Sequence, residues 1–171
     1  GYDKNPVVSP DGQHLAWESM ERDGYEADKI RLFVMNLRTG EKRDYSKGFD
    51  QNAEGLKWGD NQTVWFISDC HATDEIYSLD LVSGKIRKHT EGVHNYTSVI
   101  PNGDHLIATK TSMSKPAEIY RVDPATGKDT ELSFVNKHLL DQLTMGKVEK
   151  RWVKTTDGKK MLVWMIYPPH F

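Results

Sequence analysis

A degenerate repeat occurs three times along this chain of 171 residues. Each copy opens with a polar turn, runs through apolar strand-like segments, and closes with a hydroxyl residue followed by glycine. The closing pairs are Thr39-Gly40, Ser83-Gly84 and Thr126-Gly127, about 43 to 44 residues apart. A regular period near forty that is filled with short strands is typical of the blades of a β-propeller.

The repeat predicts an all-β fold, a partial β-propeller of about three four-stranded antiparallel blades. We expect the blades at residues 3–46, 54–89 and 95–133 within a propeller region 1–133. The third strands align so that Phe33, Tyr77 and Tyr120 share one register position. Known propellers have roughly four to eight blades. We therefore expect a piece of a longer chain, with self-association through exposed blade faces as the other way to cover them.

Net charge and the length of the apolar runs limit the classes of partner that we expect for this chain. The formal net charge is −2, which gives no reason to expect nucleic acid as a partner. The longest apolar run, residues 161–167, is far shorter than the roughly 18 residues of a membrane helix, so no membrane partner is expected. A single cysteine, Cys70, excludes an internal disulfide framework.

The pattern changes after the third repeat. We expect a connector at 134–147 in which Asn136 caps a short helix carrying Leu139, Leu140 and Leu143. Two further strands, 148–155 and 160–167, surround an Asp-Gly turn and predict a hairpin outside the blade period. We expect residues 148–171 to begin a second domain.

Three groups of residues resemble the prolyl oligopeptidase family of serine peptidases. The first is the turn Ser9-Pro10-Asp11-Gly12 with the downstream Thr39-Gly40-Glu41, a repeat that is also similar to TolB-like propellers. The second is the connector with Asn136 and its leucines. The third is the most specific and comprises Val148 to Trp152, Thr156 to Met161, and Tyr167-Pro168-Pro169.

The resemblance implies a seven-bladed propeller followed by an α/β-hydrolase domain that cleaves short peptides with a Ser-His-Asp triad. No Gly-x-Ser-x-Gly elbow occurs here, so the chain is expected to be a non-catalytic part with no catalytic residue and no cofactor. Its role would be to gate and help bind peptide substrates, and its partners would be the peptide and the C-terminal hydrolase domain. Bacterial dipeptidyl peptidases and acylaminoacyl peptidases look closest, which suggests a periplasmic or cytoplasmic setting.

The loop from Arg22 to Lys29 is the candidate recognition segment, because it is longer than its counterparts and loops on a rigid scaffold often carry recognition. Glu26 and Asp28 are the candidate substrate-binding residues. Their carboxylates would either receive the ammonium group of a substrate or pair with Lys29 or Arg31 at the rim.

A second cluster, Asp69-Cys70-His71 with Asp74 and Glu75, mixes soft and hard ligands. Metal binding needs three or four converging ligands, whereas the blade alignment places this segment in a polar loop, so no metal site is predicted. A hydrolase using Cys70 and His71 fails because adjacent residues rarely orient one side chain onto the other. The remaining alternative is a TolB-like propeller that acts as a protein or ligand binding scaffold without chemistry.

Overall fold

The structure is a computed structural model that describes residues 1–171. Its strands, in chain order, are β1 (Asp3–Val8), β2 (His14–Ser19), β3 (Arg31–Asn36), β4 (Lys42–Asp44), β5 (Glu54–Trp58), β6 (Thr63–Asp69), β7 (Asp74–Asp80), β8 (Lys85–Lys88), β9 (Asn95–Asn102), β10 (His105–Ser112), β11 (Lys115–Val122), β12 (Asp129–Glu131), β13 (Val148–Lys154) and β14 (Lys160–Ile166). One helix, α1 (Lys137–Leu140), precedes β13.

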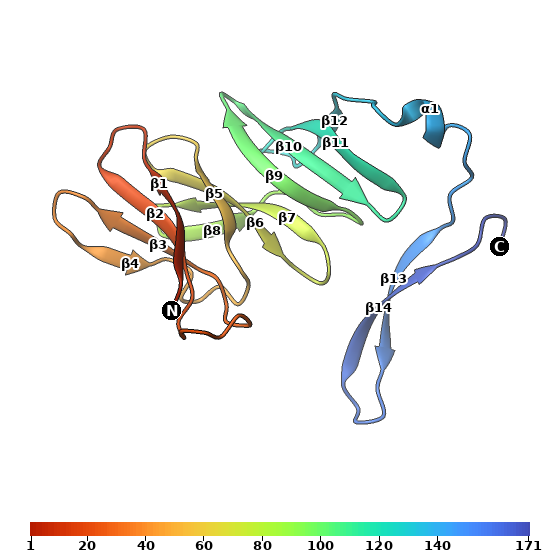
Figure 1. Cartoon of the computed structure of the whole chain (residues 1–171), viewed down its shortest axis with the longest axis horizontal. Helices are drawn as coiled ribbons and strands as arrows, with labels where there is room; N and C mark the ends of the chain where they lie inside the picture. The colour runs from red at the N-terminus through yellow and green to blue at the C-terminus, as the bar shows by residue number, and fades with distance from the viewer.

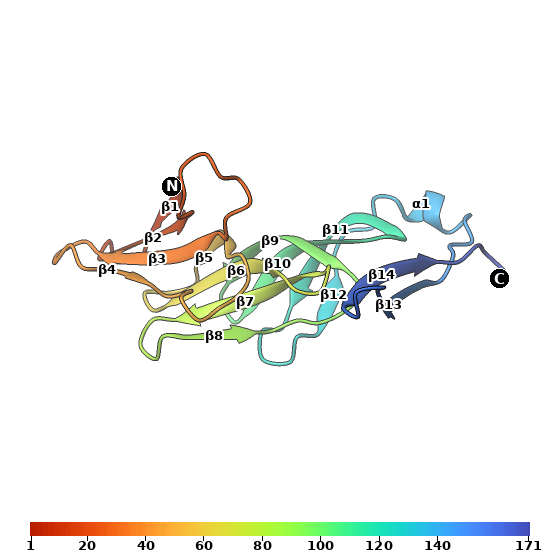
Figure 2. The ribbon, with the colours of Figure 1, turned by 90° about the horizontal axis from the view of Figure 1, so that it is seen from below.

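The strands form three antiparallel groups of four and a separate hairpin. The groups are β1–β4, β5–β8 and β9–β12, and in each the strands pair in the order in which they occur along the chain. One parallel bridge, Asp74 with Asn95, joins the second and third groups. Figures 1 and 2 show the groups side by side in a row, with the β13–β14 hairpin at the C-terminal end. This arrangement confirms the predicted all-β class, while the total blade number and the domain boundaries stay predictions.

The closing glycine of each repeat ends the third strand of its group. Gly40, Gly84 and Gly127 have φ of 74°, 68° and 71°, in the left-handed region that glycine enters without steric cost. Their amides donate to carbonyl oxygens four residues earlier, each at 2.8 Å. The repeat seen in the sequence is therefore a repeated tight turn between the third and fourth strands.

A hydroxyl that accepts a hydrogen bond from the third strand is repeated in the same way. In each third strand one backbone amide donates a hydrogen bond to the hydroxyl oxygen of the residue fourteen positions later in the chain. The pairs are Leu32 with Ser46 at 2.9 Å, Ile76 with Thr90 at 2.9 Å, and Ile119 with Ser133 at 2.8 Å. The hydroxyl ties the chain leaving each group to its third strand. The contact is buried in the first two groups, where an unpaired amide would be costly, and exposed in the third.

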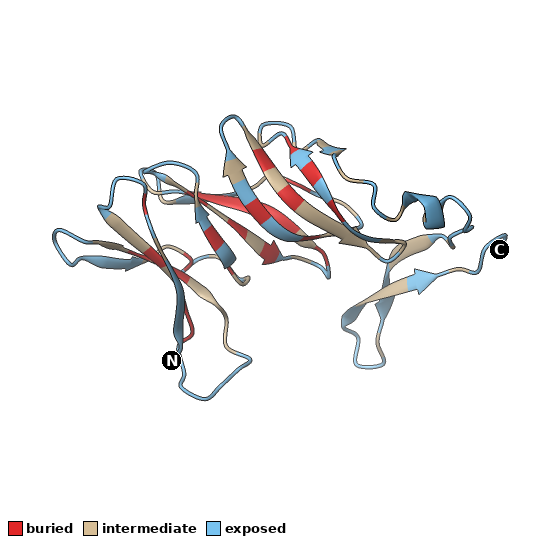
Figure 3. Ribbon diagram, turned by 45° about the horizontal axis from the view of Figure 1, so that its top comes forward, coloured by how far each residue is buried: buried red, intermediate tan, exposed pale blue.

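The core lies between neighbouring groups. One cluster joins the first group, through residues such as Ala16 and Leu32, to Val64 and Phe66 of the second. The other cluster packs Ile76 of the second group against residues of the third, and Figure 3 shows both sets buried along the strand centres. The aromatic register is also confirmed, because Phe33, Tyr77 and Tyr120 each pair with the central residue of the preceding strand: Trp17, Phe66 and Ala108.

The connector and hairpin differ in detail from the prediction. Asn136 occupies the N-cap position, but its side chain makes no capping hydrogen bond, which corrects the expected role. Leu139 and Leu143 are 54% and 59% exposed, and of the expected apolar face only Leu140 is half-buried, where it lines a cavity beside β11 and β12. The β13–β14 hairpin is confirmed, and none of its residues is buried. No helix in the chain has the length and apolar character needed to cross a bilayer.

Candidate functional site

One rim of the strand groups faces the β13–β14 hairpin. The loop after β2 and the turn after β6 lie on the same lower side of the molecule in Figure 1 as the hairpin. The contact is direct, since the rings of His71 in the β6–β7 turn and Trp152 in β13 have centroids 5.5 Å apart. We call this edge the hairpin rim.

An acidic cavity opens at this rim between the second and third groups. Its volume is about 440 Å³. It is lined by Asn52, Glu54, Gly55, Ile67, Asp69, Asp74, Tyr96 and Thr97. The carboxylates of Glu54, Asp69 and Asp74 come from three neighbouring strands, β5, β6 and β7. None of the three has a lysine, arginine or histidine nitrogen within 4.0 Å.

The electrostatics of this cavity favour a cation. Burial and the neighbouring charge of Glu18 raise the pKa of Glu54 above its ordinary value. Burial, together with the charges of Asp69 and Glu75, likewise raises the pKa of Asp74. The charge of Lys4 opposes this effect at Glu54, but no cation forms an ion pair with any of the three carboxylates. Crowded carboxylates without such a pair gain stability from a positive group that enters. The acidic cavity is therefore suited to bind an ammonium group.

Two buried carboxylates beside the cavity are already satisfied. Glu18 accepts hydrogen bonds from Asn5 at 3.0 Å and from the amide of Gly55 at 2.9 Å. Glu75 accepts from Thr90 at 2.6 Å and from the amide of Gly92 at 2.9 Å. Both side chains belong to the frame that holds the strands, and they leave the three cavity carboxylates as the groups free to meet a ligand.

The predicted recognition loop lies on the same rim, and its two acidic residues differ. Asp28 accepts hydrogen bonds from the guanidinium of Arg22, which also lies 3.9 Å from the ring centre of Tyr25. This pairing holds the pKa of Asp28 below its ordinary value. The partner is thus Arg22, rather than the Lys29 or Arg31 considered from the sequence. Glu26 is exposed and its carboxylate has no hydrogen-bond or ion-pair partner within the chain.

The cysteine and histidine cluster forms a tight turn. The Sγ of Cys70 and the Nδ1 of His71 are 3.8 Å apart, and the ring of His71 faces Trp152. No set of three or more His, Cys, Asp or Glu side chains in the chain converges in a way that holds a metal ion. The structure therefore uses this segment as a contact with the hairpin.

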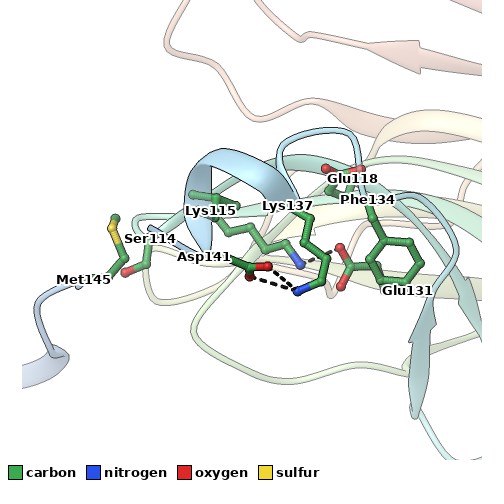
Figure 4. A pocket seen from close by; sticks show the side chains of 9 residues that line it. Ser114, Lys115, Glu118, Glu131, Phe134, Lys137, Asp141 and Met145 are labelled. Atoms are coloured by element: carbon green, nitrogen blue, oxygen red, sulfur yellow. Dashed lines mark hydrogen bonds and ion pairs between the residues drawn. The ribbon is translucent and has the colours of Figure 1, made fainter. Parts of the chain in front are cut away.

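A second cavity, of about 330 Å³, lies between β11, β12 and α1 (Figure 4). Its charged side chains neutralise one another, because Lys115 pairs with Glu131 and Lys137 pairs with Asp141. Glu118 accepts a hydrogen bond from the hydroxyl of Ser133. A cavity with its charges paired offers less to a charged ligand than the acidic cavity does.

The acidic cavity was not identified from the sequence. Asp69 and Asp74 attracted attention only as neighbours of Cys70 and His71, and Glu54 was not singled out. The available signal was positional, since all three lie at strand ends on one rim. Asp69 and Asp74 pair across the β6–β7 hairpin, while Glu54 starts the strand beside them.

The comparisons with known proteins give close relatives but no matching family model. The chain is 42% identical over 172 aligned residues to dipeptidyl-peptidase 5 of Porphyromonas gingivalis and 43% identical to that of Porphyromonas endodontalis. Both alignments cover 100% of this chain and 25% of the relative. The chain therefore spans about a quarter of the length of the curated relatives it matches.

Solved structures of similar shape are also known. Pyrococcus horikoshii acylaminoacyl peptidase matches 96% of this chain and 25% of its own with a TM-score of 0.77 at 21% identity. The β-propeller domain of the trilobed protease from Pyrococcus furiosus covers 77% of this chain and 38% of its own, with a TM-score of 0.60 and 18% identity. TolB from Acinetobacter baumannii covers 96% of this chain and 40% of its own, with a TM-score of 0.55 and 21% identity. At these identities the likeness shows the propeller fold alone.

The sequence relatives and the structural neighbours indicate the same kind of protein. A chain-long identity of 42% to a dipeptidyl peptidase accompanies the shape of a peptidase propeller. The predicted resemblance to dipeptidyl and acylaminoacyl peptidases is confirmed, and these findings support the interpretation of the chain as a peptidase propeller segment.

Proposed function

We propose that this chain is the non-catalytic propeller part of a serine peptidase of dipeptidyl or acylaminoacyl type, where it gates and helps bind peptide substrates. The observation that carries the proposal is the 42% identity to dipeptidyl-peptidase 5 across the whole chain. The chain itself has no Gly-x-Ser-x-Gly elbow. The chemistry is therefore assigned to a hydrolase domain of the same polypeptide.

The acidic cavity is the proposed contact with the substrate. An enzyme that removes dipeptides must recognise a free amino terminus, which is an ammonium group at neutral pH. Glu54, Asp69 and Asp74 supply negative charge that no ion pair neutralises, on the rim nearest the hairpin. They would attract the amino terminus and hold it at a fixed distance from the reacting bond, which is the positioning that makes catalysis efficient.

The recognition loop has a separate proposed role. Asp28 is held by Arg22, so it shapes the loop, and Glu26 remains the acceptor that the loop offers to a substrate. Because Glu26 is exposed, its interaction with a ligand is screened by water and weaker than that of the cavity carboxylates. It would steer peptides towards the rim.

The proposal is tested on the whole protein. Purified whole protein should hydrolyse dipeptidyl chromogenic substrates and should be labelled by a fluorophosphonate, which reacts with activated serine hydroxyls. The 171-residue chain, prepared in parallel, should do neither. Absence of labelling and hydrolysis in the whole protein would overturn the peptidase assignment, and hydrolysis by the chain alone would overturn its non-catalytic role.

A scaffold without chemistry is the second candidate, and the likeness to TolB favours it. A pure binding propeller has little use for a strand pair outside the repeat, whereas β13 and β14 form such a pair here. Unlabelled whole protein that captures a defined partner would support the scaffold.

A further inference from the structure

The turn between β6 and β7 has a backbone conformation that its sequence does not favour. Cys70 and Thr73 close the turn through two backbone hydrogen bonds of 2.8 and 3.2 Å. Between them His71 and Ala72 have φ of 53° and 59°. Two-residue hairpin turns with positive φ at both positions strongly prefer Asn-Gly or similar pairs. A side chain with a Cβ enters this region at a cost, so other contacts must stabilise the turn.

The contact made by this turn is with the β13–β14 hairpin. The imidazole of His71 meets the indole of Trp152 edge to face, with an interplanar angle of 86°. Edge-to-face pairs at such separations are attractive beyond the area that they bury. The strained turn therefore presents its one ring to the hairpin.

A second tryptophan of the hairpin meets the same rim. Trp152 pairs with Leu162, and Trp164 follows two residues later on β14, so both indoles are on one face of the hairpin. Trp164 lines a cavity of about 180 Å³. Its other lining residues are Ala72, Thr73, Val93, His94, Asn95, Thr111, Ser112 and Met113. Ala72 of the strained turn and Trp164 of the hairpin thus face the same cavity.

No strand pairing fixes the hairpin to the rest of the chain. β13 and β14 form a two-stranded sheet of their own and pair with no other strand of the chain. An isolated two-stranded hairpin is at best marginally stable in water. Packing of its tryptophan face on the rim is therefore the available source of order within this chain.

We propose that the His71–Ala72 turn is a latch that seats the tryptophan face of the β13–β14 hairpin on the propeller and thereby sets the direction in which the following chain leaves. His71 acts as a positioning residue through Trp152. The latch is independent of the proposed peptidase function, because amide exchange in the hairpin is measured without a substrate.

The test is amide hydrogen exchange of the hairpin in the full chain. His71→Asn removes the imidazole while placing a residue that tolerates positive φ. We expect the amides of β13 and β14 to exchange about threefold to tenfold faster, the range that corresponds to the loss of one aromatic pair. The amides of β6 and β7 should keep their rates, since asparagine suits the turn.

Three further variants make the test decisive. His138→Asn removes an exposed ring on α1, so it should leave hairpin exchange unchanged. Trp152→Leu should accelerate exchange as His71→Asn does, and the double variant should add nothing, because one contact is lost in each case. Trp152→Leu leaves the propeller sequence intact, so it decides the matter should His71→Asn disturb β6 and β7. Hairpin exchange at the unaltered rate in His71→Asn, or fully additive effects in the double variant, would overturn the latch.

Discussion

The hydroxyl of Thr90 donates a hydrogen bond of 2.6 Å to the buried carboxylate of Glu75 and accepts one of 2.9 Å from the amide of Ile76. One small side chain thus satisfies two buried groups of β7. The third group repeats the arrangement, because Ser133 donates to Glu118 and accepts from Ile119. In the first group Ser46 donates instead to Asp44. The repeat therefore conserves a hydrogen-bonding role within the chain while its residues vary.

Thr90→Val keeps the shape of this side chain and removes its hydroxyl. Because the amide of Ile76 and the carboxylate of Glu75 both lose a partner in a buried site, we expect the free energy of unfolding to fall by about 1–3 kcal/mol. Urea denaturation measures the change. The matched control is Thr130→Val on the exposed face of β12, where a change below about 0.5 kcal/mol is expected. Equal losses in the two variants would contradict the role of the Thr90 hydroxyl.

The pH dependence of stability should carry the signature of Glu75. Burial alone would raise its pKa, but hydrogen bonds from His94 and Thr90 outweigh burial and place its pKa below the ordinary 4.5. A carboxyl with a lowered folded-state pKa stabilises the fold above its unfolded pKa and loses this contribution as the pH falls through the folded-state value. Denaturation at a series of pH values from 7 down to 3 should therefore show a loss below about pH 4.5 that is smaller in Glu75→Gln. Identical pH profiles in the two proteins would refute this assignment.

The pH dependence of stability due to Glu54 and Asp74 should have the opposite sign to that due to Glu75. Their raised pKa values mean that the folded state binds protons more readily than the unfolded chain, so the ionised groups destabilise the fold at neutral pH. Glu54→Gln should stabilise the chain at pH 7 by roughly 0.5 kcal/mol, a figure reduced for solvent screening. The gain should vanish as the pH falls below the unfolded-state pKa near 4.5. Thermal unfolding at pH 7 and pH 3.5 provides the comparison, and destabilisation at pH 7 would count against the crowded-carboxylate account.

Gly127 should tolerate substitution far less than a glycine in a similar backbone conformation elsewhere. A Cβ at this position would lie 2.3 Å from the carbonyl oxygen of His89, across the boundary between the second and third groups. A Cβ at Gly103, which has φ of 63°, would meet nothing within 4 Å. We expect Gly127→Ala to cost about 2–4 kcal/mol and Gly103→Ala about 1 kcal/mol. Equal costs by chemical denaturation would show that the close approach is absent in solution.

The sequence predicted the parts of the fold that repeat. Gly40, Gly84 and Gly127 marked the period because each turn needs a left-handed residue at the same point. The aromatic register of the third strands followed from alternation within short strands. Both features depend on neighbours close in the chain, and for that reason sequence patterns carry them.

The features that could not be predicted from the sequence depend on contacts between segments that are far apart in the chain. Glu54 reaches the acidic cavity past an irregularity in β5 between Glu54 and Lys57, which no local pattern reveals. The contact of His71 with Trp152 joins segments that only the connector path brings together. For Asp28 the sequence left open a substrate ammonium group or an ion pair with Lys29 or Arg31, and the loop folds back so that Arg22 reaches it.

The most direct test of amino-terminus binding by the acidic cavity measures the hydrolysis of two substrates by the whole protein. One is a dipeptidyl chromogenic substrate with a free amino terminus, and the other is its N-acylated form. In Glu54→Gln/Asp74→Asn we expect KM for the free-amine substrate to rise about tenfold, as for the loss of a charged contact, and KM for the acylated substrate to change little. Glu41→Gln, on the opposite rim, should leave both values unaltered. An equal change for both substrates, or none for either, would contradict the claim that this propeller receives the amino terminus of a peptide.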